Sequence, residues 1–210
     1  MTGARWVVVV PVKELPVAKT RLGLPDARRT ALALAMACDV VAAAAACPLV
    51  DGVVAVTNDL RAAAALEPLG ARVVADTADA GLNPALADGA RLARALWPRH
   101  GVATLGSDLP CARPDELAAA LAAAAAFDRA VLPDARGDGT TLLTAGPGTD
   151  LDPRYGRASR AAHVAAGAVQ LTPGAWPSLE RDVDTPADLA AAVALGVGPA
   201  TRAALDSPGD

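Results

Sequence analysis

The stretch WVVVVPVKELPVAKTRL, residues 6–22, decides the fold expected for this chain. Its first seven residues form an unbroken apolar run, which is typical of a strand buried on both faces of a parallel sheet. Three cations, Lys13, Lys19 and Arg21, follow this run directly. Ligands of open α/β sheets bind beyond the carboxyl ends of the strands, so these cations are candidates to bind a triphosphate. The alternative is a solvated charged loop.

Further apolar runs alternate with helical stretches rich in alanine and leucine. Strands are predicted at residues 52–57, 72–75, 102–105 and 130–132, and helices at 28–47, 59–69, 83–97 and 114–127. Beyond residue 133, short strands at 140–144 and 169–171 flank a loop and helix at 150–166, and a last helix covers about 186–195. This order predicts an α/β fold, with a Rossmann-like, mostly parallel sheet and helices on both faces.

Two helix starts carry capping signals. Asn83 followed by proline predicts an N-cap and a proline at the first helical position. Thr185, three residues before Asp188, predicts a variant of the capping box. We expect one domain over residues 1–210, with an ordered core at about 5–200 and a frayed end.

The composition limits the possible partners and compartments. The 210 residues carry a net charge of −4 and no large basic patch, so we expect no nucleic-acid partner. No apolar run looks long enough to span a membrane, and the three scattered cysteines favour a reducing compartment, so we expect a cytoplasmic protein. The two histidines exclude a histidine-based zinc site, and His163 is expected on a helix surface. A homo-oligomer is possible, and the sequence does not decide the oligomeric state.

Three aspartates are candidate metal ligands. Asp108 follows the strand at residues 102–105, where its carboxylate would point into the cleft. Asp182 and Asp184 alternate along an extended segment, so both would point to the same side. Carboxylate oxygens suit Mg²⁺, and Asp108 could share a metal with this pair. The alternatives are a turn aspartate at 108 and an aspartate at 184 that only supports the helix start.

Two glycine-containing segments could hold an anion. They are GDGTT, residues 137–141, and YGRAS, residues 155–159. Glycine amides and small hydroxyls suit a phosphate or a carboxylate, although such segments are usually only turns. Neither GxxxxGK[ST] nor GxGxxG follows the first strand, which argues against a P-loop and a dinucleotide-binding fold.

Taken in order, PVKELPVAKTRL, the Gly81-Leu82-Asn83 turn, GSDLP, GDGTT, YGRAS and DVDTPADL resemble one family. This family is the guanylyltransferases of coenzyme F420 biosynthesis, within the nucleotide-diphospho-sugar transferase-like fold. Its members join GTP to a phosphorylated three-carbon acid. The resemblance covers residues 6–200, and the lysine-rich first loop distinguishes it from relatives that make activated sugars or molybdenum cofactors.

The resemblance implies a role for each motif. Asp108 and Asp182 would bind two Mg²⁺ ions, with Asp184 adjacent, and Lys13, Lys19 and Arg21 would contact the triphosphate of GTP.

For the remaining motifs, Thr141, Gly156 and Ser159 would hold the phosphate of the acid, and Gly81, Leu82 and Asn83 would lie near the base. Phosphoenolpyruvate is the expected acid, with 2-phospho-L-lactate and 3-phospho-D-glycerate as alternatives. An ionised phosphate needs no general base, which agrees with the lack of an evident catalytic histidine or cysteine.

Two other classes of function stay open on the sequence alone. One is a nucleotidyltransferase that acts on a molybdenum cofactor or a sugar phosphate. The other is a non-catalytic module that binds a phosphorylated metabolite and releases no pyrophosphate.

Overall fold

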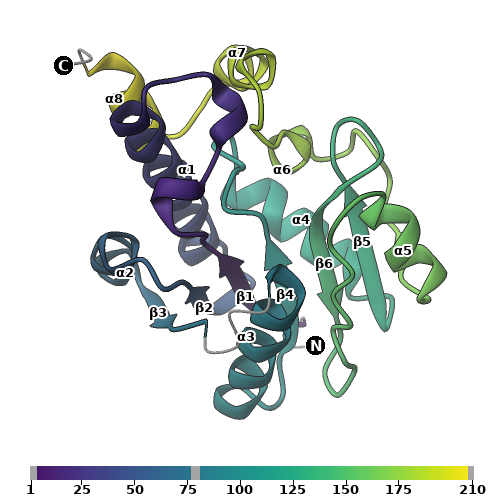
Figure 1. Cartoon of the computed structure of the whole chain (residues 1–210). Coiled ribbons are helices and arrows are strands. Elements are labelled where there is room, and N and C mark those ends of the chain that lie inside the picture. Colours follow the sequence, from purple (N-terminus) through teal and green to yellow (C-terminus); the bar gives the residue numbers. More distant parts are fainter. Residues whose placement is uncertain (1–3, 77–80, 208–210) are drawn as a thin grey trace.

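The computed structural model describes residues 4–76 and 81–207, and these form one seven-stranded sheet with helices packed against it (Figure 1). The strands are β1 (Trp6–Pro11), β2 (Val50–Val56), β3 (Ala71–Val74), β4 (Gly101–Leu105), β5 (Arg129–Pro133), β6 (Thr140–Ala145) and β7 (Val169–Gln170). All seven lie where the apolar runs predicted strands. The expected α/β class is therefore confirmed.

The sheet has the order β3-β2-β1-β4-β6-β5-β7. β1 pairs in parallel with both β2 and β4, and β3 and β7 are parallel to their neighbours β2 and β5. Within the described sheet, only β6 runs antiparallel to its neighbours. The chain leaves β1 toward β2 and later returns to the other side of β1 as β4, so the topological switch point lies between β1 and β4.

The helices are α1 (Asp26–Ala46), α2 (Leu60–Leu66), α3 (Leu82–Leu96), α4 (Pro114–Ala124), α5 (Ser159–Ala165), α6 (Pro177–Glu180), α7 (Pro186–Leu195) and α8 (Pro199–Asp206), with short 3₁₀ turns η1 (Leu15–Val17), η2 (Thr20–Leu22) and η3 (Glu67–Leu69). Val8 and Val10 of β1 pack in a core with side chains of α1 and α4, whereas Val7 and Val9 pack in a second core with α3. Both faces of β1 are therefore buried, which is why its sequence shows no polar alternation.

Helix α1 has 21 residues, and its most apolar 18-residue window has a mean hydropathy of 1.5, so its length and composition alone would allow it to cross a membrane. However, 67% of its most apolar window is buried inside the fold. Its side chains Met36, Ala37 and Val40 are completely buried. These features are those of a core helix in a globular protein.

One predicted capping signal is confirmed and the other is wrong. Thr185 and Asp188 form the capping box at the start of α7, with each side chain accepting from the other's backbone N–H. Helix α3 begins at Leu82 with Gly81 as its N-cap, so Asn83 is not the cap. Gly81 has φ +100°, a conformation that favours glycine. The Asn83 side chain instead hydrogen-bonds the backbone of Tyr155, which lies far away in the sequence.

Helix α8 extends beyond residue 200, and the sequence pattern did not predict it. Its N-terminus is capped from a distance by Asp39 of α1, whose carboxylate accepts from the amides of Ala200 and Thr201 at 2.9 and 2.8 Å. Asp39 is only 6% exposed, and a Cβ at Gly198 would lie 2.4 Å from its carboxyl carbon. This close approach requires glycine at 198.

We expect Asp39→Ala to destabilise the protein by about 2 kcal/mol, because two amides of α8 lose a charged acceptor. The measurement is urea denaturation followed by circular dichroism. Asp128→Ala is the control, since Asp128 is exposed. Equal midpoints for the two variants would contradict the capping role.

Candidate active site

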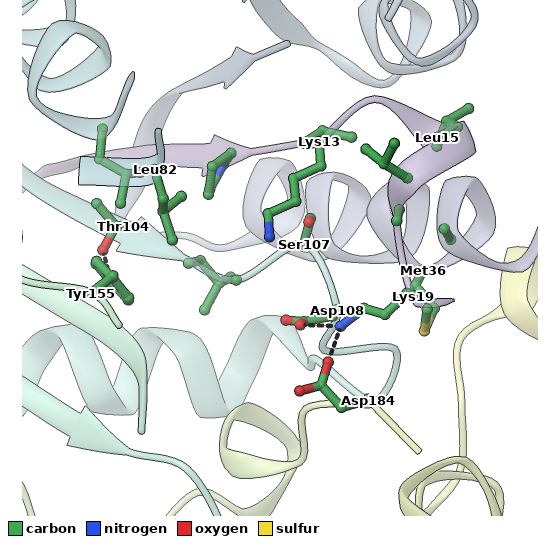
Figure 2. A pocket seen from close by; sticks show the side chains of 18 of the residues that line it. Lys13, Leu15, Lys19, Met36, Leu82, Thr104, Ser107, Asp108, Tyr155 and Asp184 are labelled. Atoms are coloured by element: carbon green, nitrogen blue, oxygen red, sulfur yellow. Dashed lines mark hydrogen bonds and ion pairs between the residues drawn. The ribbon is translucent and has the colours of Figure 1, made fainter. Parts of the chain in front are cut away.

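A cavity of about 390 Å³ opens at the switch point, beyond the carboxyl ends of β1 and β4. Its walls come from the first loop, α1, the first turn of α3, the end of β4, the start of β6, and two single residues, Tyr155 and Asp184. Figure 2 shows how segments far apart in the sequence meet around it. Of the residues predicted to be functional, Lys13, Lys19, Arg21, Asp108, Leu82 and Asp184 line this cavity.

The first loop, residues 12–25, is held in place by buried polar contacts. Arg29 of α1 is 4% exposed and donates to three carbonyls of the loop, those of Leu15, Pro16 and Ala18. Asp59 accepts from the amide of Leu15 at 2.9 Å. These contacts fix the segment just before Lys19. No sequence pattern singled out Arg29 or Asp59.

Lys19 is the electrostatic centre of the site. Its Nζ lies 2.5 Å from Asp108 Oδ2 and 2.7 Å from Asp184 Oδ1 (Figure 2). Its backbone is left-handed, with φ +56°, which is uncommon for a residue with a side chain. Burial lowers the pKa of Lys19, but the two carboxylates outweigh burial and raise it, so the ammonium stays protonated.

Arg21 lies at the mouth of this cluster. Its Nη2 donates to Asp184 Oδ2 at 2.5 Å, and its side chain is 69% exposed. Burial alone would raise the pKa of Asp184, but Lys19 and Arg21 lower it below the usual value. Four of the predicted residues, Lys19, Arg21, Asp108 and Asp184, are therefore brought together, although they lie far apart in the sequence.

Asp108 follows β4 in a tight turn. A Cβ at Gly106 would lie 2.7 Å from Asp108 Oδ1, so glycine allows the carboxylate to fold back against the turn. The amide of Val183 donates to the carbonyl of Asp108 at 3.0 Å, which places the DVD segment beside it. This backbone contact, invisible in the sequence, joins the two predicted acidic motifs.

Asp182 is not one of the residues that line the cavity. Burial and the nearby carboxylates of Asp108, Asp134 and Asp184 raise the pKa of Asp182 to about 6. An aspartate with a raised pKa among other carboxylates marks a region of excess negative charge. Such a region favours a bound cation.

Lys13 reaches into the cavity from the first loop (Figure 2). It and Lys19 are the two lysines of the chain, so both side-chain amines lie in this loop. Leu82 lines the cavity, while Gly81 and Asn83 do not. The amide of Asn83 is engaged with the Tyr155 backbone, at 3.0 Å as donor and 2.7 Å as acceptor. A role for these three residues beside the base stays a prediction.

The start of β6 contains an irregularity in pairing. Leu132 of β5 pairs with Leu142, but the next residue, Pro133, pairs with Thr140, so Thr141 is the extra residue. Such a bulge interrupts the alternation of side chains and re-aims them. Thr140 lines the cavity, whereas the hydroxyl of Thr141 is buried and has no hydrogen-bond partner among the described residues.

Ser159 and Gly156 are the other predicted acid-binding residues. Ser159 is 2% exposed, and its hydroxyl donates to Thr140 Oγ1 at 3.2 Å. Gly156 has φ +142°, and a Cβ there would meet no atom within 4 Å. Neither Ser159 nor Gly156 lines the cavity. Their predicted contact with a phosphate therefore stays a prediction.

The expectation of His163 as a helix-surface residue is wrong. His163 is 1% exposed, and its ring meets that of Tyr155 edge to face, with centroids 5.0 Å apart. Tyr155 in turn lies 2.5 Å from the hydroxyl of Thr104, and burial raises the pKa of Tyr155, so it stays protonated. The segments GDGTT and YGRAS include Thr140 and Tyr155, but the sequence gave neither residue a role of its own, and no pattern pointed to Thr104. The one signal available was that Tyr155 is the single tyrosine of the chain.

The buried His163 should make stability depend on pH. Burial lowers the pKa of His163 to about 4, below its value of 6.5 in an unfolded chain. The unfolded state therefore binds more protons between these values, and stability that is complete above pH 6.5 is lost as pH falls toward 4. The loss should reach about 3 kcal/mol.

This dependence is measured by urea denaturation at a series of pH values. The difference in unfolding free energy between the wild type and His163→Phe should shrink steadily from pH 6.5 to 4. His100→Phe serves as the control, since His100 is half-buried beside Asp51. A difference that does not vary with pH would contradict the assignment.

Two solved structures of low sequence identity share this fold. 4-Diphosphocytidyl-2C-methyl-D-erythritol synthase matches with a TM-score of 0.63 at 14% identity, over 91% of this chain and 99% of that chain. A nucleotidyl transferase from Methanothermobacter matches with a TM-score of 0.57 at 18% identity, over 92% and 98%. The fold is that of the nucleotidyltransferases, and the acidic and cationic groups at its switch point suit that class of enzyme.

Sequence comparison identifies the family to which the chain belongs within the nucleotidyltransferases. A family model described as "Guanylyl transferase CofC like" matches residues 6–207, and the chain belongs to that family. A relative from Geodermatophilus obscurus is 57% identical over 208 residues, 95% of this chain and 94% of its own length. One from Streptomyces coelicolor is 56% identical over 201 residues, 95% of each. Both relatives are named phosphoenolpyruvate guanylyltransferase, and the family resemblance is confirmed.

Proposed function

We propose that this enzyme condenses GTP with phosphoenolpyruvate, giving enolpyruvyl-2-diphospho-5'-guanosine and pyrophosphate, a step of coenzyme F420 biosynthesis. The observation that carries the transfer chemistry is the cluster of Lys19, Asp108 and Asp184 at the switch-point cavity. The names of the close relatives support the identity of the acid. The relatives' names, and the family's, disfavour a sugar phosphate or a molybdenum cofactor as acceptor.

Mg²⁺ is the proposed metal of this site, and to bind it the carboxylates would have to rearrange. In the described part of the chain no three acidic side chains are close enough together to hold a metal ion, and the Lys19 ammonium lies between Asp108 and Asp184. Hard oxygen ligands suit this ion, and Asp108 and Asp184 on the cavity wall and the nearby Asp182 could supply them. Burial, and after it the charges of the neighbouring carboxylates, raise the pKa of Asp182, and a cation would relieve the repulsion between these carboxylates. When bound, Mg²⁺ would neutralise charge on the triphosphate and the departing pyrophosphate. Asp108 and Asp182 are its proposed main ligands, with Asp184 adjacent.

The reaction needs little covalent help from the protein. A phosphate oxygen of the acid attacks the α-phosphorus of GTP, and the bond from that phosphorus to the oxygen of the leaving pyrophosphate breaks. The attacking phosphate is ionised at pH 7, so no base has to remove a proton. What the chain supplies is in-line positioning and positive charge, and Lys13, Lys19 and Arg21 line the cavity where a triphosphate would lie.

The acid is proposed to bind where β6 begins. The buried, unpartnered hydroxyl of Thr141 supports this, because a buried donor without a partner is costly unless a ligand completes it. The amide of Gly156 and the hydroxyl of Ser159 are the other proposed contacts. In this structure the Ser159 proton goes to Thr140, so Ser159 would have to turn to reach a phosphate. Leu82 and the adjacent Gly81 and Asn83 are proposed to lie near the base.

The test is pyrophosphate release by the wild-type protein with GTP and Mg²⁺ and each of three acids in turn. Phosphoenolpyruvate should give rapid release, and 2-phospho-L-lactate and 3-phospho-D-glycerate should give little. A preference for either of the other acids would overturn the acceptor. Release with a sugar phosphate or molybdopterin, but with none of the three acids, would overturn the whole assignment of acceptor class. ATP and CTP in place of GTP control for the base.

A further inference from the structure

The hydroxyl of Thr140 has an unusual hydrogen-bonding environment. Thr140 lines the cavity, and its Oγ1 lies 3.0 Å from His163 Nδ1 and 3.2 Å from Ser159 Oγ. Both neighbours are on α5 and both are almost fully buried.

The contact from the Arg154 backbone fixes the protonation of His163. The amide of Arg154 donates to His163 Nε2 at 2.8 Å, so Nε2 must be an acceptor. A neutral imidazole with an accepting Nε2 carries its hydrogen on Nδ1. Nδ1 therefore donates to Thr140 Oγ1, and Ser159 donates to the same oxygen.

Two incoming hydrogen bonds leave Thr140 a donor only. A hydroxyl oxygen has two lone pairs, and His163 and Ser159 occupy both. The hydrogen of the Thr140 hydroxyl must then be directed elsewhere. Among residues 4–76 and 81–207 no hydrogen bond from it to a protein acceptor is found, and Thr140 lies on the wall of the cavity.

We propose that Thr140 binds an anionic oxygen of the phosphorylated acid, and that His163 and Ser159 are positioning residues that fix its hydroxyl as a donor. In this arrangement Ser159 keeps its hydrogen bond to Thr140, which replaces the direct contact of the Ser159 hydroxyl with the acid. The proposal rests on the proposed function and adds a residue to the acid's site. A hydroxyl restricted to donation can donate to a carboxylate or phosphate oxygen and disfavours a substrate group that can only donate. The bulge in β6 turns Thr140 toward this position.

The test compares Michaelis constants for phosphoenolpyruvate and GTP in three variants. Thr140→Val should raise the KM for phosphoenolpyruvate by about tenfold to a hundredfold, because a hydrogen bond to an anion is lost. Its KM for GTP should change by less than about threefold, on the expectation that GTP contacts other residues. Thr140→Ser keeps the hydroxyl and should restore the KM for the acid. Thr144→Val is the matched control, since Thr144 lies on the same strand and its hydroxyl bonds the Ala130 carbonyl.

The role of His163 is tested by a double-mutant cycle. His163→Phe removes the Nδ1 donor and should raise the KM for the acid in the wild-type background, but add little once Thr140 is Val. Equal effects in both backgrounds would show that His163 acts only on stability and would overturn its positioning role. An unchanged KM for the acid in Thr140→Val, or equal increases in both KM values, would overturn the role of Thr140.

A variant that does not fold and a wild type that is inactive each have a separate interpretation. If Thr140→Val does not fold, as judged by circular dichroism, Thr140→Ala gives the same readout without a second methyl group to place. If the wild-type protein releases no pyrophosphate from GTP and phosphoenolpyruvate, the proposed function has failed. A wild type that is active on phosphoenolpyruvate, with an unaffected Thr140 variant, means that the inference alone has failed.

Discussion

Asp108→Asn is expected to reduce phosphoenolpyruvate-dependent pyrophosphate release by at least about a thousandfold, or roughly 4 kcal/mol of transition-state stabilisation. The substitution keeps the size of the side chain and removes its charge. That charge pairs with Lys19 at 2.5 Å and is one of the proposed ligands of Mg²⁺. Asparagine supplies only a neutral oxygen at the same place, so the cation is held less well.

The measurement is single-turnover and steady-state release of pyrophosphate over a series of Mg²⁺ concentrations. Asp115→Asn is the matched control, because Asp115 is an exposed aspartate in the first turn of α4. The fold of Asp108→Asn should persist, since Asp108 lies in a turn and its backbone contact with Val183 does not involve the side chain. Turnover close to that of the wild type in saturating Mg²⁺ would refute a central role for this carboxylate.

Lys19→Met is expected to lower kcat/KM for GTP by about a hundredfold, or roughly 2.7 kcal/mol. The ammonium lies between Asp108 and Asp184, so its removal leaves these carboxylates to repel each other and the triphosphate. Lys19→Arg should recover little of the activity, because a planar guanidinium does not fit the position of a compact ammonium.

The measurement is steady-state kinetics with GTP varied at saturating phosphoenolpyruvate and Mg²⁺. Arg99→Met removes an exposed cation outside the site and serves as the control. The Lys19 variant should retain its circular dichroism spectrum. An unchanged kcat/KM for GTP would mean that the first loop is a solvated surface and that its contacts with the carboxylates are incidental.

The parts of the site that follow a buried strand could be predicted from the sequence. The apolar runs of β1 and β4 indicate where each strand ends, and both strands are parallel members of one sheet, so Lys19 and Asp108 could be placed at the same edge. The DVD segment was found from its own spacing. Its position beside Asp108, however, depends on one backbone hydrogen bond from Val183.

The parts that depend on pairing between distant segments could not be predicted. The bulge that exposes Thr140 to the cavity arises from the register of β6 against β5, and a single strand carries no sign of it. His163 is buried because α5 lies against Tyr155, and α8 is capped by Asp39 on α1. Nothing in the sequence distinguishes Arg29 from other helix residues, and its role follows only from its hydrogen bonds to the loop carbonyls. Each of these features is a tertiary contact with no local pattern.

Both lysines of the chain lie in the first loop, so reagents that modify lysine side chains can react only there. Acylating reagents modify amines only in their neutral form, and the raised pKa of Lys19 between its carboxylates protects it. An amine-directed probe should therefore label the side chains of this protein at Lys13 first, and bound GTP should block that labelling. A single mass-shifted peptide containing residue 13 would report occupancy of the nucleotide site without any measurement of turnover.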